Sequence, residues 1–142
     1  MRPRATALAV VTLTACGGGQ WREADARLQE ASAPARAAGL APLSGRNNEF
    51  GTFTDSGTVR WTLALERGRS YFLAAVCTEG CRGLDLEVTL PDGMLLGRDS
   101  SGGAVAALSF ESPSTGNHPV RMSVAGCSQD TCRWAAQLYS RP

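Results

Sequence analysis

The chain has 142 residues, with 14 basic against 13 acidic side chains and a single histidine. This charge balance provides no strongly basic surface, so we expect no nucleic-acid partner. The length suits one domain with a hydrophobic core.

The first residues have the layout of a secretory signal. Arg2 and Arg4 precede an uncharged, apolar-rich segment at residues 5–15, which is too short for a permanent transmembrane helix of about 20 residues. The motif LTAC at residues 13–16 resembles the bacterial lipobox, in which the cysteine receives a diacylglyceryl group and becomes the new N-terminus. The alternative is an ordinary signal peptide with an incidental cysteine.

The lipobox resemblance implies a location as well as an anchor. Residues 1–15 would be removed, and several acyl chains on Cys16 would hold the mature chain at a membrane. In Gram-negative lipoproteins an aspartate directly after the cysteine favours the inner membrane, and here that position is Gly17. The resemblance therefore implies an envelope protein anchored in the outer membrane and facing the periplasm.

Residues 16–47 are predicted to form a lipidated tether and a short helix. Three glycines at residues 17–19 favour a flexible connection, and Pro34 should stop or kink the helix. The apolar side chains that recur at helical spacing are Trp21, Ala24, Leu28 and Ala31. This stripe is thin, so a firmly packed helix and a loosely docked one both remain open.

From Asn48 onward the hydrophobic period changes to two, which is typical of strands. The predicted strands cover residues 48–53, 58–66, 70–77, 84–90, 93–97, 104–111, 120–126 and 133–140. The sequence PDG at residues 91–93 is a strong turn signal. About eight short strands at hairpin spacing predict that residues 48–142 form an antiparallel β-sandwich or jelly roll.

Three segments of this region resemble the bacterial pre-peptidase C-terminal domain. They are LERGRSYF at residues 65–72, LDLEVTLPDG at residues 84–93 and STGNHPVRMSV at residues 114–124. One departure is His118, which stands where that family usually has an aromatic residue. The resemblance implies a non-catalytic accessory module, some members binding calcium, collagen or polysaccharide, and it transfers no enzyme active site.

Four cysteines remain after Cys16 is assigned to the lipid. They form two closely spaced pairs, Cys77 with Cys81 and Cys127 with Cys132. A zinc site is compatible with this spacing, but a secreted chain meets an oxidising compartment in which disulfides persist. A redox centre would normally show Cys-x-x-Cys beside a βαβ unit. Disulfides within each pair are favoured, and pairing between the two pairs remains the alternative.

Other polar residues give weaker signals. His118 is the only histidine and has no nucleophile elbow near it, so we expect a packed strand residue rather than a catalytic base. Asp85, Asp92 and Asp99 could supply oxygen ligands to calcium, but their spacing matches no EF-hand loop. We expect Asp85 on a solvated strand face and Asp92 in a turn.

Aromatic side chains are the candidates for ligand binding. Trp21, Trp134 and Tyr139 could stack on a sugar, but Trp134 shares the inward alternation of Ala136 and Leu138 and is expected in the core. Tyr139 is expected to be exposed. Trp21 and Tyr139 are therefore the predicted ligand-binding residues.

Together these features predict a cell-envelope lipoprotein without a cofactor. Its sandwich would act as a non-enzymatic interaction module that binds a protein or a glycan at the envelope. The alternative is a structural or assembly partner of another envelope protein or of a secreted hydrolase, and a calcium-binding module or an enzyme is less favoured.

Overall fold

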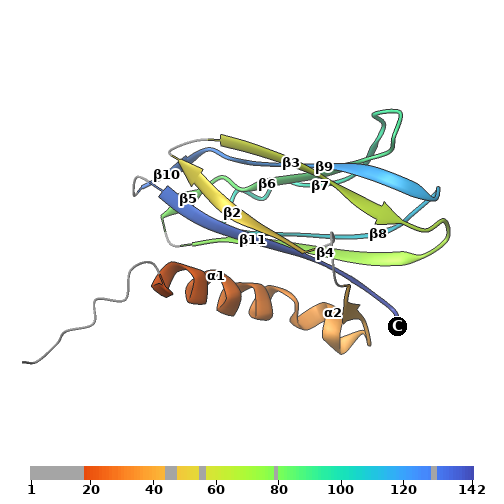
Figure 1. Cartoon of the computed structure of the whole chain (residues 1–142), viewed down its shortest axis with the longest axis horizontal. Helices are drawn as coiled ribbons and strands as arrows, with labels where there is room; N and C mark the ends of the chain where they lie inside the picture. Colours follow the sequence, from red (N-terminus) through yellow and green to blue (C-terminus); the bar gives the residue numbers. More distant parts are fainter. Residues whose placement is uncertain (1–17, 44–47, 55–56, 79, 129–130) are drawn as a thin grey trace, which may run out of the picture.

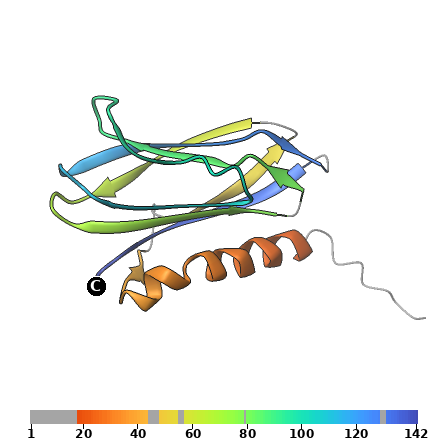
Figure 2. The ribbon, with the colours of Figure 1, turned by 180° about the vertical axis from the view of Figure 1, so that it is seen from behind.

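The chain folds as two antiparallel sheets packed face to face, with a helix outside one of them (Figures 1 and 2). The structure is a computed structural model that describes residues 18–43, 48–54, 57–78, 80–128 and 131–142. The predicted signal and Cys16 lie outside the described residues. Within them, eight strands have five residues or more and three have two residues. The mainly β, antiparallel sandwich predicted from the sequence is confirmed.

One sheet, here the helix-covered sheet, has the order β1-β11-β4-β8, with β2 also paired to β11. Its strands are β1 (Ala41–Pro42), β2 (Asn48–Thr54), β4 (Ser70–Cys77), β8 (Val105–Glu111) and β11 (Thr131–Ser140). The strands β1 and β2 pair with successive stretches of the same edge of β11.

The second sheet, here the open sheet, has the order β3-β9-β6-β7. Its strands are β3 (Gly57–Leu65), β6 (Asp85–Thr89), β7 (Leu95–Asp99) and β9 (Gly116–Val124). A small ribbon pairs β5 (Cys81–Arg82) with β10 (Gly126–Cys127).

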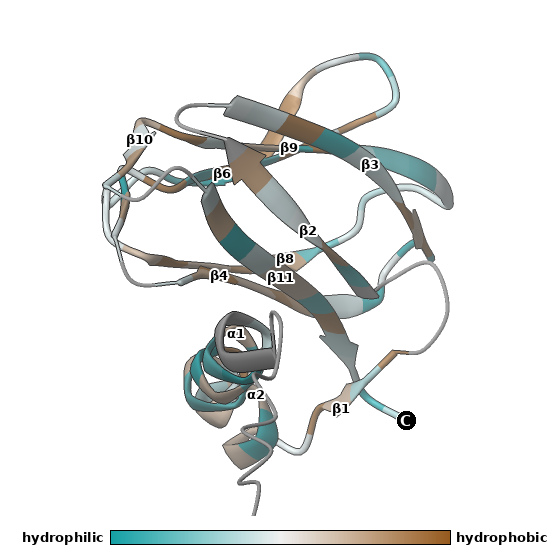
Figure 3. Cartoon of the chain, turned by 60° about the vertical axis from the view of Figure 1, so that its left-hand side comes forward, coloured by the Kyte–Doolittle hydropathy of each residue, from teal (hydrophilic) through white to brown (hydrophobic). Residues whose placement is uncertain are grey.

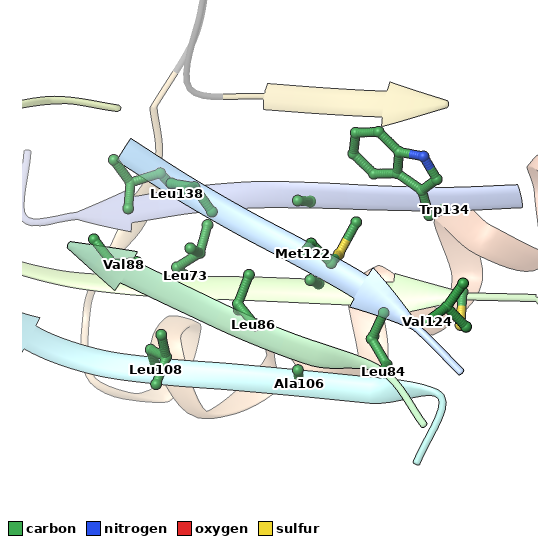
Figure 4. Packing of buried hydrophobic residues seen from close by; sticks show 14 of the residues in the cluster. Leu73, Leu84, Leu86, Val88, Ala106, Leu108, Met122, Val124, Trp134 and Leu138 are labelled. Atoms are coloured by element: carbon green, nitrogen blue, oxygen red, sulfur yellow. The ribbon is translucent and has the colours of Figure 1, made fainter. Parts of the chain in front are cut away.

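The main core lies between the two sheets (Figure 4). Its largest fully buried side chains are Leu63, Leu73, Leu84, Leu86, Met122 and Leu138. Trp134 is 5% exposed and stacks on Trp61 with ring centroids 5.6 Å apart, which confirms its expected place in the core. Its indole reaches β2 at Gly51, where an added Cβ would stand 2.8 Å from Trp134 Nε1.

The strand β4 of the helix-covered sheet is apolar on both faces from Tyr71 to Val76. Ala74 and Val76 of β4 point away from the main core and pack with Leu28 of α1 (Gly18–Ala31) and Tyr139 of β11. Figure 3 shows α1 nearly end-on beside β4 and β11. The firmly packed helix, one of the two alternatives, is therefore the observed one.

The helical segment breaks near the predicted proline. A second helix, α2 (Ala33–Ala37), has Pro34 in its first turn, where a missing N–H costs nothing. Ser32 at the break donates a hydrogen bond from Oγ to the carbonyl of Leu28 at 2.6 Å. Among the described residues, neither helix is long and apolar enough to cross a membrane.

Two local predictions need correction. The flexible tether predicted at residues 17–19 is wrong for its last two glycines, because α1 already begins at Gly18. A first helical turn tolerates glycine since later turns hold it in place. The strand β9 begins at Gly116, earlier than predicted, and includes Pro119. Pro119 is tolerated there because β6 pairs with β9 only from Val120 to Ser123, so the proline lies where β9 has one neighbour.

The two cysteine pairs form the disulfides Cys77–Cys81 and Cys127–Cys132, the pairing favoured from the sequence. Cys81 and Cys127 are register partners in the β5–β10 ribbon. Both disulfides therefore fix loops at one end of the sandwich, and each closed loop is short enough to contribute only about 2 kcal/mol in the loop-entropy picture.

Asp99 connects the two sheets. Its carboxylate accepts hydrogen bonds from the backbone N–H of Ala107 on β8 at 2.9 Å and of Ser101 at 3.0 Å. Partial burial opposes the charge and raises the pKa of Asp99, but the hydrogen bonds from Ala107 and Ser101 outweigh this effect. The pKa of Asp99 therefore lies below its ordinary value.

Substitution of Gly51 by alanine should destabilise the sandwich. The new methyl group would overlap the indole of Trp134, and forcing an extra carbon into a packed site costs about 1–3 kcal/mol. Gly97→Ala is the matched control, because a Cβ there meets Leu108 at an ordinary 3.6 Å. Urea unfolding measures both variants, and equal stability of the two would contradict the packing described for Trp134.

The link through Asp99 should weaken in acid. A carboxylate whose pKa is lowered by folding stabilises the fold above its unfolded pKa of about 3.9, and this stabilisation is lost as the pH falls through the folded value. Asp99→Asn should therefore show a smaller drop in melting temperature between about pH 5 and pH 3 than the parent chain. Asp92→Asn, at an exposed turn, is the control and should follow the parent; a parent-like drop in Asp99→Asn would rule out this role.

Candidate functional site

A groove of about 430 Å³ lies between α1 and the outer face of β11. It forms because α1 covers β4 and β11 while the outer face of β2 stays uncovered at its side. The lining residues are Trp21, Ala24, Asp25, Leu28, Gln29, Arg36, Pro42, Phe50, Ala135, Gln137 and Tyr139. A volume of this size, with mostly apolar walls and a few polar groups, is typical of sites for small ligands.

Two polar side chains at the floor of the groove have hydrogen-bonding capacity left over. Tyr139 is 3% exposed, and no hydrogen bond joins its hydroxyl to any described residue. Gln137 is 7% exposed and donates from Nε2 to the carbonyls of Leu43 at 2.6 Å and Leu138 at 2.9 Å. These two acceptors fix the orientation of the amide, so its Oε1 remains as an acceptor without a partner in the described chain.

Neither of these oxygens is sealed inside the protein. Among the described residues, Trp134 Nε1 is the side-chain nitrogen or oxygen that is both fully buried and without a hydrogen-bond partner. The Oε1 of Gln137 and the hydroxyl of Tyr139 also lack a partner, but they are not fully buried. They therefore remain within reach of solvent although most of each side chain is covered. A ligand in the groove could satisfy them by hydrogen bonding.

An aromatic wall closes one end of the groove. Trp21 contacts Phe50 edge-to-face with ring centroids 5.4 Å apart, and the guanidinium of Arg133 lies 4.7 Å from the Trp21 ring centre. Arg133 is held by a hydrogen bond to Thr52 Oγ1 at 2.9 Å. Phe50 is 68% exposed, so the wall presents an aromatic surface toward solvent.

The rim of the groove carries one charge of each sign. Arg36 donates to the side-chain oxygen of Gln29 at 2.9 Å and to its carbonyl at 2.6 Å, so its guanidinium is already engaged. The carboxylate of Asp25 has no ion pair or hydrogen bond with a described residue. The described lining of the groove therefore has no concentrated charge of either sign.

The structure brings both predicted ligand-binding residues, Trp21 and Tyr139, to this groove. The expectation that Tyr139 is exposed is wrong, because α1 covers its side of the sheet. Phe50 and Gln137 were missed by the sequence analysis. A glutamine inside the apolar run RWAAQLYS is a signal that could have pointed to Gln137, since an uncharged polar residue on a covered face needs a partner.

His118 packs inside β9, as expected. It is fully buried, with Nδ1 3.1 Å from the carbonyl oxygen of Gly116 and Nε2 within 3.4 Å of the hydroxyls of Ser112 and Ser114. Ser112 in turn donates to the carbonyl of Ser114 at 2.7 Å. These contacts hold the turn between β8 and β9, and His118 is not among the residues that line the groove beside α1.

The three weak calcium candidates do not converge. Asp85 forms a hydrogen-bonded ion pair with Arg98, and the hydrogen bond and charge of Asp85 raise the pKa of Arg98. Asp92 accepts a hydrogen bond from the N–H of Met94 within the predicted turn, and Asp99 binds the amides described above. Within the described chain, no three His, Cys, Asp or Glu side chains are grouped to hold a metal ion.

No protein-family model and no curated protein matches the chain by sequence. Among solved structures it is similar to PliG of Aeromonas hydrophila, a periplasmic inhibitor of g-type lysozyme, at 15% identity and a TM-score of 0.43, covering 71% of this chain and 89% of that one. It is also similar to the C-terminal family 6 carbohydrate-binding module of a laminarinase from Zobellia galactanivorans, at 11% identity and a TM-score of 0.37, covering 70% and 87%. A carbohydrate-binding module described for mannan recognition gives 14% identity and a TM-score of 0.37, covering 78% and 94%. Likenesses this weak say nothing about what this chain binds.

Proposed function

We propose that the mature chain is a lipid-anchored, non-enzymatic binding module of the bacterial cell envelope, and that its groove takes a short neutral glycan. The observation that carries the proposal is the pair of unpartnered oxygens on Gln137 and Tyr139 beside an aromatic wall. A protein or peptide ligand is the alternative that the binding test below distinguishes.

The groove matches the two-sided chemistry of a sugar. A pyranose has apolar C–H faces that pack on aromatic and aliphatic walls, here Trp21, Phe50 and Leu28, and hydroxyls that both donate and accept hydrogen bonds. Gln137 Oε1 offers an acceptor, and the hydroxyl of Tyr139 offers either role. A purely apolar ligand would leave both oxygens unsatisfied, which is unfavourable.

The shape and charge of the groove favour a neutral oligomer. Ala135, Gln137 and Tyr139 follow one another on the same face of β11, so the floor extends over about 13 Å at the usual strand rise. The guanidinium of Arg36 is hydrogen-bonded to Gln29 and Asp25 lies in the same lining, so the described lining carries no excess positive charge that would favour a strongly anionic ligand.

The envelope location rests on the N-terminal sequence. The lipobox-like LTAC ends at Cys16, and α1 begins two residues later at Gly18. An acylated Cys16 would place the domain at a membrane surface, and Gly17 favours the outer membrane with the domain in the periplasm. The two disulfides are consistent with an oxidising compartment.

Removal of the Tyr139 hydroxyl should weaken glycan binding without unfolding the domain. Tyr139→Phe keeps the ring packed against Phe72 but deletes one hydrogen bond, which should lower affinity about tenfold. An array of neutral oligosaccharides identifies the strongest binder, and calorimetry with that oligosaccharide measures the affinity of parent and variant.

The matched control is Tyr71→Phe. Tyr71 is also buried in the helix-covered sheet, but its hydroxyl accepts a hydrogen bond from the N–H of Glu66 at 2.8 Å on the inner side. This variant should lose stability and keep its affinity. Glycan binding that is unchanged in both Tyr139→Phe and Trp21→Ala would refute the groove as the site, and binding of peptides but not of sugars would replace the glycan by the protein alternative.

The anchor is tested separately by intact mass. Full-length protein made in a bacterium that processes lipoproteins should lose residues 1–15 and gain the mass of acyl chains, whereas Cys16→Ser should remain unacylated. Reduction should then add about 2 Da for each of the two disulfides. An unacylated mature chain that begins at another residue would contradict the lipid anchor while leaving the groove proposal intact.

A further inference from the structure

A row of charged side chains crosses the outer face of the open sheet, away from α1. The strand register places Arg60 of β3 opposite Arg121 of β9, Arg121 opposite Glu87 of β6, and Glu87 opposite Arg98 of β7. Arg60, Glu87 and Arg121 alternate with buried or half-buried residues in their strands, so they share the solvent face. Arg98 is exposed and contacts Asp85 and Glu87 on that same face. The four strands thus align three guanidinium groups with one carboxylate.

The charges in this row are compensated at one end only. Arg98 pairs with Asp85 at 2.5 Å and lies 3.8 Å from Glu87, and Arg121 lies 3.4 Å from the same Glu87. Arg60 has no ion pair or hydrogen bond with any described residue. The positive charge that is left over therefore lies on β3 and β9.

Arg60 and Arg121 are direct cross-strand neighbours, which places two like charges side by side. Such pairs destabilise a sheet, and here Arg121 has only a share of Glu87 to offset its charge. The carboxylates that the structure describes on this face, Asp85 and Glu87, belong to β6, two strands away from Arg60. A bound anion would relieve this repulsion.

The surroundings of the two arginines supply further hydrogen-bond donors. Thr58 and Thr62 lie two residues to either side of Arg60 on the same face, and Ser123 lies two residues from Arg121. Thr58 and Ser123 are register partners. Hydroxyls on the same face as the guanidinium pair can donate to the remaining oxygens of a tetrahedral anion.

We propose that Arg60 and Arg121 form a binding site for a phosphate group. A single carboxylate is satisfied by one guanidinium fork, whereas two adjacent forks present two positive charges and more donors, which suits a dianionic phosphate. The site lies on the face opposite the groove and does not depend on the glycan proposal.

Inorganic phosphate is the first probe. At constant ionic strength, exchange of chloride for phosphate should raise the melting temperature of the purified protein by about 5 °C once phosphate exceeds its Kd tenfold. Acetate at the same ionic strength should give a smaller rise. No difference between phosphate and chloride, or an equal rise with acetate, would overturn the site.

Three variants assign the effect to the arginine pair. Arg60→Gln should lose the phosphate-dependent rise. Arg60→Glu should place a carboxylate opposite Arg121, melt no lower than the parent in chloride and also lose the rise, which separates loss of binding from loss of folding. Arg22→Gln, at an exposed position on α1, should respond like the parent. A full phosphate response in Arg60→Glu would refute the proposal.

The source of the phosphate is distinguished by two further probes. Co-sedimentation with phosphatidylcholine vesicles that contain phosphatidic acid tests a lipid phosphate, and calorimetry with glucose 1-phosphate tests a soluble one. Binding of either probe that is lost in Arg60→Gln supports the site and names its source. Binding of neither probe would overturn the proposal even if inorganic phosphate stabilises the fold.

Discussion

The structure depends on one constraint: β4, a central strand of the helix-covered sheet, carries apolar side chains on both faces from Tyr71 to Val76. The inner face packs into the sandwich core, but Ala74 and Val76 on the other face would meet water without a cover. The helix α1 provides that cover through Leu28. Small side chains on the sheet let the helix approach closely, so the burial of this second apolar face places an α-helical layer on an otherwise all-β fold.

The same cover creates the groove. A single helix is narrower than a sheet of several strands, so α1 shields β4 and β11 and leaves the outer face of β2 uncovered beside it. Gln137 and Tyr139 lie at the boundary between the covered and uncovered regions, which is why they are largely buried yet keep oxygens within reach of a ligand. The open sheet needs no cover, because its outer face carries charged and hydroxyl side chains. This face is therefore suited to charged ligands, whereas the groove is suited to neutral ones.

Much of the fold could be predicted from local pattern. The change to a period of two at Asn48 marks the strands, and short spacing favours the observed disulfides. The groove could not be predicted, because Trp21, Phe50 and Gln137 are far apart in the sequence and meet only when α1 docks. Tyr139 was expected at the surface for the same reason, since nothing in the final strand shows that a helix near the N-terminus covers it.

The position at which α1 begins has a mechanical consequence. Gly18 follows Cys16 by two residues, and a fully extended chain of that length spans only about 7 Å. With the lipid on Cys16 as proposed, the domain cannot travel across the periplasm and instead pivots within a shallow layer above the bilayer. The ligands available to the domain would then be limited by their distance from the membrane as well as by their chemistry. Only molecules within about one domain diameter of that membrane could reach the groove or the arginine pair on the open sheet.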